Sequence, residues 1–235
     1  MHPVGVTFAL VHGAWHGAWC WERMPEPLAA RGHGAVAMDL PCEDVDAGLD
    51  AYADVVAAAL SGVEDAVVVV AHSLGGLVAP LVAARRPVRS IAYLAAFVPL
   101  AGQSMADQFA ASPEPILIFP SRPEADEHGR SHWVGEAATT AALYADLTPE
   151  DAHRAFARLR PQAPTTQREP HPRGLPDVPA VSLVCSDDRA VNPVWSRRVA
   201  RERLGVEPIE LPTGHFPMIT APELLADALA DVARE

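Results

Sequence analysis

The sequence predicts an α/β fold in which a mostly parallel sheet of about six strands carries helices on both faces. Strand-like and helix-like segments alternate over most of the 235 residues, and that alternation is typical of parallel sheets. Val67 to Val70 form a run of four β-branched residues, which favours a central strand buried on both faces. Hydrophobic residues make up 49% of the chain and charged residues 20%, so one well-buried core is expected.

Short apolar runs give the strands, and longer stretches with apolar residues on one face give the helices. In chain order, the expected strands span 6–11, 34–40, 67–72, 88–94, 179–185 and 208–211. The expected helices span 19–30, 52–60, 74–84, 194–204 and 222–233. Each expected helix follows an expected strand, which is the order of a parallel sheet covered on both faces.

Ser73 lies where the 67–72 strand gives way to an apolar helical segment. Ala71 stands two residues before it and Gly75 two residues after, and small residues there allow the sharp turn called a nucleophile elbow. The Leu74 N–H, at the start of the helix, would then point toward the group that Ser73 attacks. The alternative is a serine N-cap on an ordinary helix. The valine strand and Gly75 favour the nucleophile.

An acid and a histidine follow later strands, in the order that a serine nucleophile needs. Asp187 and Asp188 come directly after the 179–185 strand, and His215 lies in the loop after the 208–211 strand. The order nucleophile, acid, base belongs to α/β-hydrolases. Because ligand sites in open parallel sheets lie at the carboxyl ends of the strands, the three loops can converge. The residues alone do not choose between the two aspartates.

The turn after the first core strand is expected to complete the site. It reads His12-Gly13-Ala14, and such a turn typically supplies a second oxyanion N–H, here that of Ala14. We expect His12 to fix this loop by hydrogen bonding. We expect His72, beside the nucleophile, to pack and to position a loop, and not to act as a second base.

The stretch from Pro99 to Pro179 breaks the alternation. It holds 12 of the 23 prolines, so it cannot continue a regular parallel sheet. Short helices are expected at 105–110, 137–144 and 149–160. We interpret residues 99–176 as a cap inserted into a core of residues 1–98 and 177–235. The alternative is a long decorative loop, which is uncommon at this length.

Several segments along the whole chain resemble one family. They are 11–21, 71–76, 94–99, 143–146, 159–161 and 184–188. They look like the plant methylesterase and hydroxynitrile lyase family and its bacterial esterase relatives. The resemblance implies an α/β-hydrolase fold and a serine-dependent carboxylic ester hydrolase for small, fairly apolar aryl or alkyl esters. Matching the motif assigns the acid to Asp188, which leaves Asp187 as a solvated or loop-capping carboxylate.

Substrate-binding residues are expected at the carboxyl ends of the strands and in the cap. Further apolar candidates in the cap are Ile116, Leu117 and Phe119. The residues that we expect to contact substrate are Gly13, Trp15, His72, Phe97, Phe109, Trp133 and Phe216.

Three positions depart from the lyase branch of the resembled family. That branch carries a threonine where Gly13 stands, a glutamate where His72 stands and a lysine where Phe216 stands. The lysine handles the departing cyanide charge, so its absence makes hydrolysis the better inference than cyanohydrin cleavage. Two other readings stay open: a cyclase or lyase that uses the same triad in a biosynthetic route, and a hydrolase-like ligand receptor.

Composition limits the partners. The net charge of −12 argues against binding to nucleic acid or to an anionic membrane, and no apolar run reaches the roughly 20 residues of a membrane span. No cofactor and no metal are expected, because the chain shows neither a glycine-rich phosphate loop nor metal-ligand spacing. Three cysteines and the early first core strand, which leaves no room for a signal peptide, suit a cytoplasmic protein. The expected partner is a small-molecule ester; a homodimer is left open.

Overall fold

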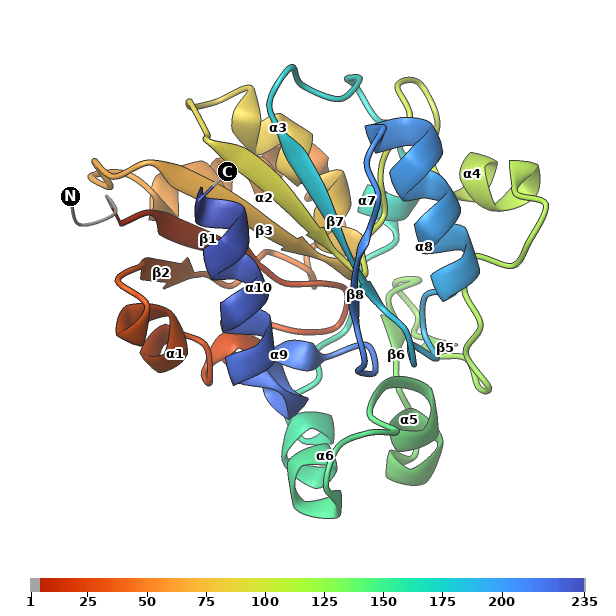
Figure 1. Ribbon diagram of the computed structural model, residues 1–235. Coiled ribbons are helices and arrows are strands. Elements are labelled where there is room, and N and C mark those ends of the chain that lie inside the picture. Colours follow the sequence, from red (N-terminus) through yellow and green to blue (C-terminus); the bar gives the residue numbers. More distant parts are fainter. Residues whose placement is uncertain (1–4, 235) are drawn as a thin grey trace.

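The computed structural model describes residues 5–234 and contains one six-stranded sheet in the order β2-β1-β3-β4-β7-β8. All neighbouring strands in this sheet run parallel, which confirms the predicted fold class. The strands are β1 (Thr7–Val11), β2 (Gly34–Ala37), β3 (Val67–His72), β4 (Ser90–Leu94), β7 (Ala180–Cys185) and β8 (Ile209–Leu211). Figure 1 shows the twisted sheet between its two layers of helices.

The helices of the core alternate with these strands. They are η1 (Ala18–Trp21), α1 (Pro25–Ala30), α2 (Leu49–Ala59), η2 (Ser73–Leu77), α3 (Ala79–Ala83), α8 (Pro193–Val199), η3 (Ala200–Leu204), α9 (Pro217–Thr220) and α10 (Pro222–Arg234). Here η1 and η2 are 3-10 helices and η3 is a π-helix. Among residues 5–234, no helix is long and apolar enough to cross a membrane.

Alternate residues of each central strand face opposite layers, because side chains in a strand point to opposite faces of the sheet. In β3, Val67 and Val69 pack with α2, α3 and α8, whereas Val68 and Val70 pack with α1 and α10. The side chains of β3 are buried along its whole length. A run of valines is therefore the composition that this strand needs, since it contributes to both hydrophobic cores.

Three expected helices are interrupted. The 19–30 helix is two pieces, since Pro25 lacks an N–H and opens α1 as a new helix. The 74–84 helix begins as the 3-10 helix η2 and becomes α3 only near Pro80. The 194–204 helix ends in a π-helical turn. Apolar periodicity predicted where these helices lie, but not these changes of helical type.

The cap contains the three expected helices, which are α4 (Met105–Ala111), α5 (Glu136–Leu143) and α6 (Pro149–Phe156). It also contains a short helix and a two-stranded antiparallel hairpin that the sequence did not indicate, namely α7 (Thr165–Arg168), β5 (Glu124–Ala125) and β6 (Ser131–His132). Side chains of Ser104 and Thr148 cap the first turns of α4 and α6. Figure 1 shows α5 and α6 set apart below the layered core.

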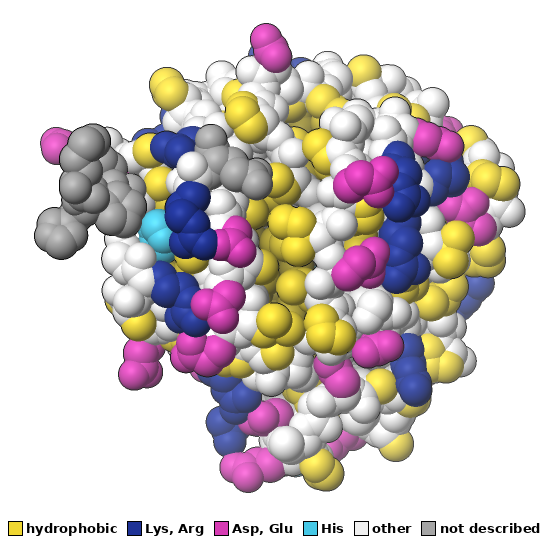
Figure 2. All heavy atoms as spheres, in the orientation of Figure 1, with side chains coloured by type: hydrophobic (Ala, Val, Ile, Leu, Met, Phe, Trp, Pro, Cys, Tyr) yellow, Lys and Arg dark blue, Asp and Glu magenta, His cyan; other side chains and the backbone are white. Residues whose placement is uncertain are grey.

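Acidic and basic side chains alternate on the face shown in Figure 2, and many of them are paired. Along α8 and η3, Arg197 pairs with Glu210 at 2.8 Å and Arg201 with Glu207 at 2.8 Å. Exposed pairs of this kind contribute about 0–1 kcal/mol each. Charges of both signs thus lie on either side of the hydrophobic side chains in the middle of this face, while the fold depends on the two apolar layers beneath.

Candidate active site

Ser73 follows the last residue of β3 and has a positive φ of 51°. Only glycine adopts such a backbone easily, so the chain is strained at this residue. The neighbouring glycines allow the turn. A Cβ on Gly75 would lie 2.9 Å from the His12 carbonyl oxygen, and one on Gly76 would collide with the Phe97 carbonyl oxygen. This is the sharp strand-to-helix turn expected from the sequence, and it leaves Ser73 partly exposed while its neighbours are buried.

The carboxylate that contacts His215 is that of Asp188. The Nδ1–H of His215 donates to Asp188 Oδ2 at 2.6 Å, and the two residues are 4% and 5% exposed. The other oxygen of Asp188 accepts the backbone N–H groups of Ala190 and Val191, at 2.7 and 2.9 Å. These three bonds fix the carboxylate and the imidazole ring, so that Nε2 of His215 carries a free lone pair.

Asp187 lies on the surface beside this pair. It is exposed, and its backbone N–H donates to the Thr213 carbonyl at 3.1 Å, which ties the acid loop to the histidine loop. Within residues 5–234, no hydrogen bond joins the Ser73 hydroxyl to His215. Hydrogen bonds of this kind are often long in free enzymes and shorten when a substrate is bound.

The first core loop, after β1, lies against Ser73. A Cβ on Gly13 would lie 2.8 Å from the Ser73 Cβ, so only glycine fits this close approach. Within the described chain, the N–H groups of Ala14 and Leu74 donate to no other residue. Both residues are buried, at 6% and 2% exposure. Two unused donors beside a serine hydroxyl are what a developing oxyanion requires.

Buried histidines hold this loop. The His12 Nδ1–H donates to the Gly13 carbonyl at 2.8 Å, and its Nε2 accepts the Leu40 N–H at 2.9 Å. The His16 Nδ1–H donates to the Ala14 carbonyl at 2.7 Å. Burial lowers the pKa of His12 to about 4 and that of His16 to about 3, so both rings are neutral near neutral pH.

His72 is completely buried, and its Nε2–H donates to the His215 carbonyl at 2.9 Å. Burial and the nearby imidazoles of His215 and His16 lower its pKa well below the usual value. Its Nδ1 has no hydrogen-bond partner in the described chain. The structure thus places His72 against the backbone of the His215 loop.

Phe216 is 1% exposed and lies among rings rather than at an open surface. Its ring stacks on His16 at 4.5 Å between centroids and lies 4.9 Å from both His72 and His215. It is also 5.2 Å from Tyr144 of the cap. The structure therefore brings Phe216 against the back of the site.

A cavity of about 400 Å³ opens in the cap beside the first core loop. Its lining residues are Trp15, Phe109, Pro115, Ile116, Leu117, Phe119, Arg122, Pro123, Ser131 and Gln167. Phe97 lies between Ser73 and this cavity without lining it: its N–H donates to the Ser73 carbonyl at 3.0 Å, and its ring lies 6.1 Å from the ring of Phe109, which lines the cavity. Trp133 packs edge-on against Trp15 at 5.5 Å, outside the lining.

The polar residues of this cavity were missed by sequence reasoning. Arg122 stands in a proline-rich loop, and Ser131 and Gln167 stand in β6 and α7, which are too short to give a periodic signal. Ser131 accepts the indole N–H of Trp15 at 2.9 Å, which fixes one wall of the cavity. The sequence indicates only that the cap supplies part of the lining, and it does not indicate which polar residues do so.

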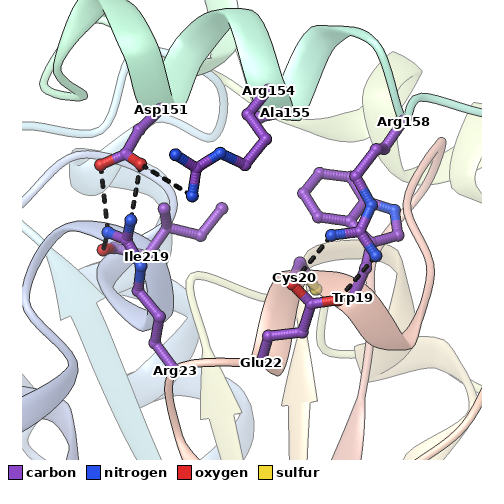
Figure 3. A pocket seen from close by; sticks show the side chains of 9 residues that line it. All are labelled: Trp19, Cys20, Glu22, Arg23, Asp151, Arg154, Ala155, Arg158 and Ile219. Atoms are coloured by element: carbon purple, nitrogen blue, oxygen red, sulfur yellow. Dashed lines mark hydrogen bonds and ion pairs between the residues drawn. The ribbon is translucent and has the colours of Figure 1, made fainter.

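A second, shallower hollow of about 50 Å³ lies between η1 and α6. Figure 3 shows that its charged side chains point toward one another. Arg23 pairs with Asp151 at 2.5 Å, and Arg158 pairs with Glu22 at 2.7 Å. Since these charges satisfy each other, we interpret the hollow as an ionic attachment of the cap to the core.

Among residues 5–234, no group of three or more His, Cys, Asp or Glu side chains is placed to hold a metal ion. The three cysteines are free and buried. Burial raises the pKa of the Cys20 thiol and, to about 11, that of Cys42. Each therefore packs as a neutral thiol.

Known proteins are similar to this chain in sequence and in fold. The alpha/beta hydrolase family matches residues 8–228. A probable esterase of Oryza sativa subsp. indica is 32% identical, covering 99% of this chain and 98% of its own length. Methylesterase 2 of Arabidopsis thaliana is 28% identical over 96% of this chain and 95% of its own. A pyrethroid hydrolase from Sphingobium faniae JZ-2 shares the fold, with a TM-score of 0.85, 23% identity and 97% of each chain covered.

Proposed function

The chain belongs to the α/β-hydrolase family, and we propose that it hydrolyses small, fairly apolar esters with Ser73 as nucleophile. The observation that carries the proposal is the 2.6 Å bond between His215 and Asp188, together with the strained serine after β3. The similar proteins named esterase and methylesterase support ester hydrolysis as the reaction.

In the acylation step, the free Nε2 of His215 takes the hydroxyl proton as Ser73 Oγ attacks the ester carbonyl carbon. Asp188 keeps the imidazole in the correct tautomer and stabilises the imidazolium that forms. The N–H groups of Ala14 and Leu74 receive the oxyanion, and loss of one such donor typically costs about 10²–10³-fold in rate. His215 then protonates the alkoxide as the carbon–oxygen bond breaks, and the alcohol leaves.

Deacylation repeats these steps with water. His215 takes a proton from a water molecule as its oxygen attacks the acyl carbon on Ser73, and the same two N–H groups hold the oxyanion. The bond to Ser73 Oγ then breaks, and His215 returns the proton to the serine. The residues that act need no other reactant than the ester and water.

The cap cavity supports a substrate of modest size with an apolar body. Its volume of about 400 Å³ lies in the range of small-molecule sites, and aromatic and aliphatic side chains make most of its lining. Trp15 and Phe109 contribute large aromatic side chains to this lining. Aryl and short alkyl esters match this lining better than highly charged ones.

Cyanohydrin cleavage is not favoured by the residues around His215. Phe216 is buried among aromatic rings, so this position offers no cation to a leaving cyanide. Gly13 offers no hydroxyl near the oxyanion donors, and His72 gives its N–H to the His215 carbonyl. A lyase would need a different set of side chains at these three positions.

The test combines turnover with covalent labelling. We expect the purified protein to hydrolyse p-nitrophenyl acetate and small methyl esters, with release of acid and alcohol in equal amounts. A p-nitrophenyl phosphonate should inactivate it with one equivalent bound, and peptide mass spectrometry should find the label on Ser73. Cyanide release from mandelonitrile without ester hydrolysis, an isomerised product, or ligand binding without turnover would each contradict the proposal.

A further inference from the structure

Two residues of the cap contact the loops that hold the catalytic groups, although neither faces the nucleophile. Tyr144 and Asp146 follow α5 and are separated by one residue. Tyr144 is completely buried, and Asp146 borders a cavity of about 80 Å³ beside His215 and Gly214. In the sequence, this segment only contributes to the family resemblance, and no role is predicted for it.

Asp146 holds the backbone next to His215. Its carboxylate accepts the Gly214 N–H at 2.7 Å. A Cβ on Gly214 would collide with this carboxylate, so the contact is close as well as polar. On the other side, the His215 carbonyl accepts the His72 N–H at 2.9 Å. The peptide unit before Gly214 and the peptide unit after His215 are therefore both held by hydrogen bonds, the first of them from the cap.

Tyr144 holds the first core loop through His16. Since the His16 Nδ1–H is given to the Ala14 carbonyl, its Nε2 can only accept, and the Tyr144 hydroxyl donates to it at 2.7 Å. The low pKa of His16, caused by burial, keeps this ring neutral and the direction of the bond constant. The cap thus reaches the loop of one oxyanion donor through two hydrogen bonds.

A third contact joins the same parts. The Arg160 N–H of the cap donates to the Trp15 carbonyl at 2.8 Å. The His16 ring also stacks on Phe216, the residue after His215, so the two loops contact each other behind the nucleophile. The loop that contains Ala14 and the loop that contains His215 are therefore both contacted by residues 144–146 of the cap.

We propose that Tyr144 and Asp146 are positioning residues. Their hydrogen bonds hold the loop of Ala14 and the loop of His215 in the alignment that the reaction needs, and this alignment depends on the cap being packed against the core. The inference rests on the proposed ester hydrolysis. A misplacement of about 1 Å can lower a rate roughly 100-fold, so contacts remote from the substrate can have large effects on turnover. Both residues act on kcat, because neither lines the cap cavity.

The test for Asp146 compares two replacements. Asp146→Ala removes the acceptor, and we expect kcat for p-nitrophenyl acetate to fall roughly 10- to 100-fold with KM within about twofold. Asp146→Asn keeps an oxygen that can accept the Gly214 N–H, and it should stay within about threefold of wild type. Asp126→Ala is the matched control, since Asp126 also accepts backbone N–H groups in the cap, at 2.9 Å from His128 and Arg130.

The test for Tyr144 uses Tyr144→Phe, with Tyr52→Phe as control. Tyr52 is an equally buried tyrosine, and its hydroxyl accepts from Gln162 of the cap at 3.1 Å without touching a catalytic loop. We expect Tyr144→Phe to lower kcat about 10-fold and to weaken binding of an aryl boronic acid, which forms a tetrahedral adduct, by a similar factor. Tyr52→Phe should change neither.

A spectroscopic readout is independent of turnover. The His215 Nδ1 proton in its short bond to Asp188 should give a far-downfield proton NMR signal. We expect Asp146→Ala to broaden or remove this signal, and Asp146→Asn to retain it. Wild-type kcat and an unchanged signal in Asp146→Ala, or equal losses in the alanine and asparagine variants, would overturn the proposal for Asp146. Wild-type boronate affinity in Tyr144→Phe would overturn it for Tyr144. If the wild-type protein hydrolysed no ester, the proposed function would fail while the NMR comparison still decided this inference.

Discussion

The core and the cap meet at the active site, but they hold their residues in different ways. In the core, Ser73 and Asp188 follow the ends of β3 and β7, and main-chain geometry sets their positions. In the cap, Tyr144 and Asp146 act through single side-chain hydrogen bonds to distant loops. In the proposed function, the ends of the strands supply the reacting groups, and the cap would align them through these side-chain contacts. Changes in the core should therefore abolish turnover, and changes in the cap should modulate it.

The largest effect is expected from Ser73→Ala. Loss of the nucleophile should lower kcat/KM for p-nitrophenyl acetate by more than about 10⁴-fold, because the remaining groups cannot form an acyl-enzyme. Folding should be unaffected, since the hydroxyl packs in no core, and thermal unfolding measures this. If Ser73→Ala kept near-wild-type turnover, Ser73 would not be the nucleophile, and the assignment of the reacting groups to the core would be wrong.

The next largest effect separates two adjacent acids. Asp188→Asn should lower kcat about 10³–10⁴-fold, because an amide in place of the carboxylate favours the wrong tautomer of His215. Asp187→Asn should stay within about threefold, since Asp187 is exposed and contacts the histidine loop only through its backbone. Steady-state kinetics of both variants decides the assignment, and the reverse ranking would show that Asp187 is the catalytic acid.

A smaller effect concerns stability in acid. His12 and His16 of the core have pKa values lowered to about 4 and about 3, whereas in the unfolded chain they titrate near 6.5. Below pH 6.5 the unfolded state therefore binds protons that the folded state does not bind. The free energy of unfolding decreases as the pH is lowered, until the pH reaches the folded-state pKa values. Each histidine should contribute about 1.4 kcal/mol per pH unit in this window.

Urea unfolding at pH 7, 6 and 5 measures this loss of stability. His128→Gln, at an exposed histidine of the cap, should leave the slope unchanged. Constant stability from pH 7 to pH 5 would mean that the buried core histidines are not kept neutral.

The smallest effect is expected at the ionic attachment of the cap. Arg23 lowers the pKa of Asp151, but this pair lies at the surface, where such interactions contribute about 0–1 kcal/mol. Asp151→Ala should therefore cost less than about 1 kcal/mol in urea unfolding, and less still in high salt. Its kcat should match wild type. A large loss of kcat would show that this attachment, and not the hydrogen bonds of the buried Tyr144 and the exposed Asp146, aligns the site.

The sequence predicted most of the core strands and helices because they depend on local patterns, and the same patterns indicated the candidate site residues, whose roles stay predictions. The valine run of β3 and the apolar runs of the other strands are needed wherever a strand is buried on both faces. Ser73 follows the buried strand β3 at once, the aspartate pair comes one residue after β7, and His215 lies in the loop after the partly exposed strand β8, so the strands indicated the loops that hold these candidates. Only the choice between the aspartates required more than the pattern of the residues.

The cap could not be predicted in the same detail, because its contacts join residues far apart in the chain. Tyr144 and His16 are 128 residues apart, and Asp146 and Gly214 are 68 apart. The periodic patterns of helices and strands relate residues only a few positions apart, so they do not indicate such pairs. The β5–β6 hairpin is two residues per strand, too short to give an alternating pattern. Trp15 and Phe109 were expected to contact substrate, whereas the polar lining of the same cavity left no trace in the sequence.

The strained backbone of Ser73 has a consequence for engineering this protein. A left-handed conformation costs a non-glycine residue roughly 1–2 kcal/mol, and glycine would relieve it. Ser73→Gly should therefore be inactive and yet more thermostable than the native enzyme. Any screen that selects for heat resistance without also selecting for turnover would favour loss of the nucleophile, so a library for thermostability should leave position 73 unvaried.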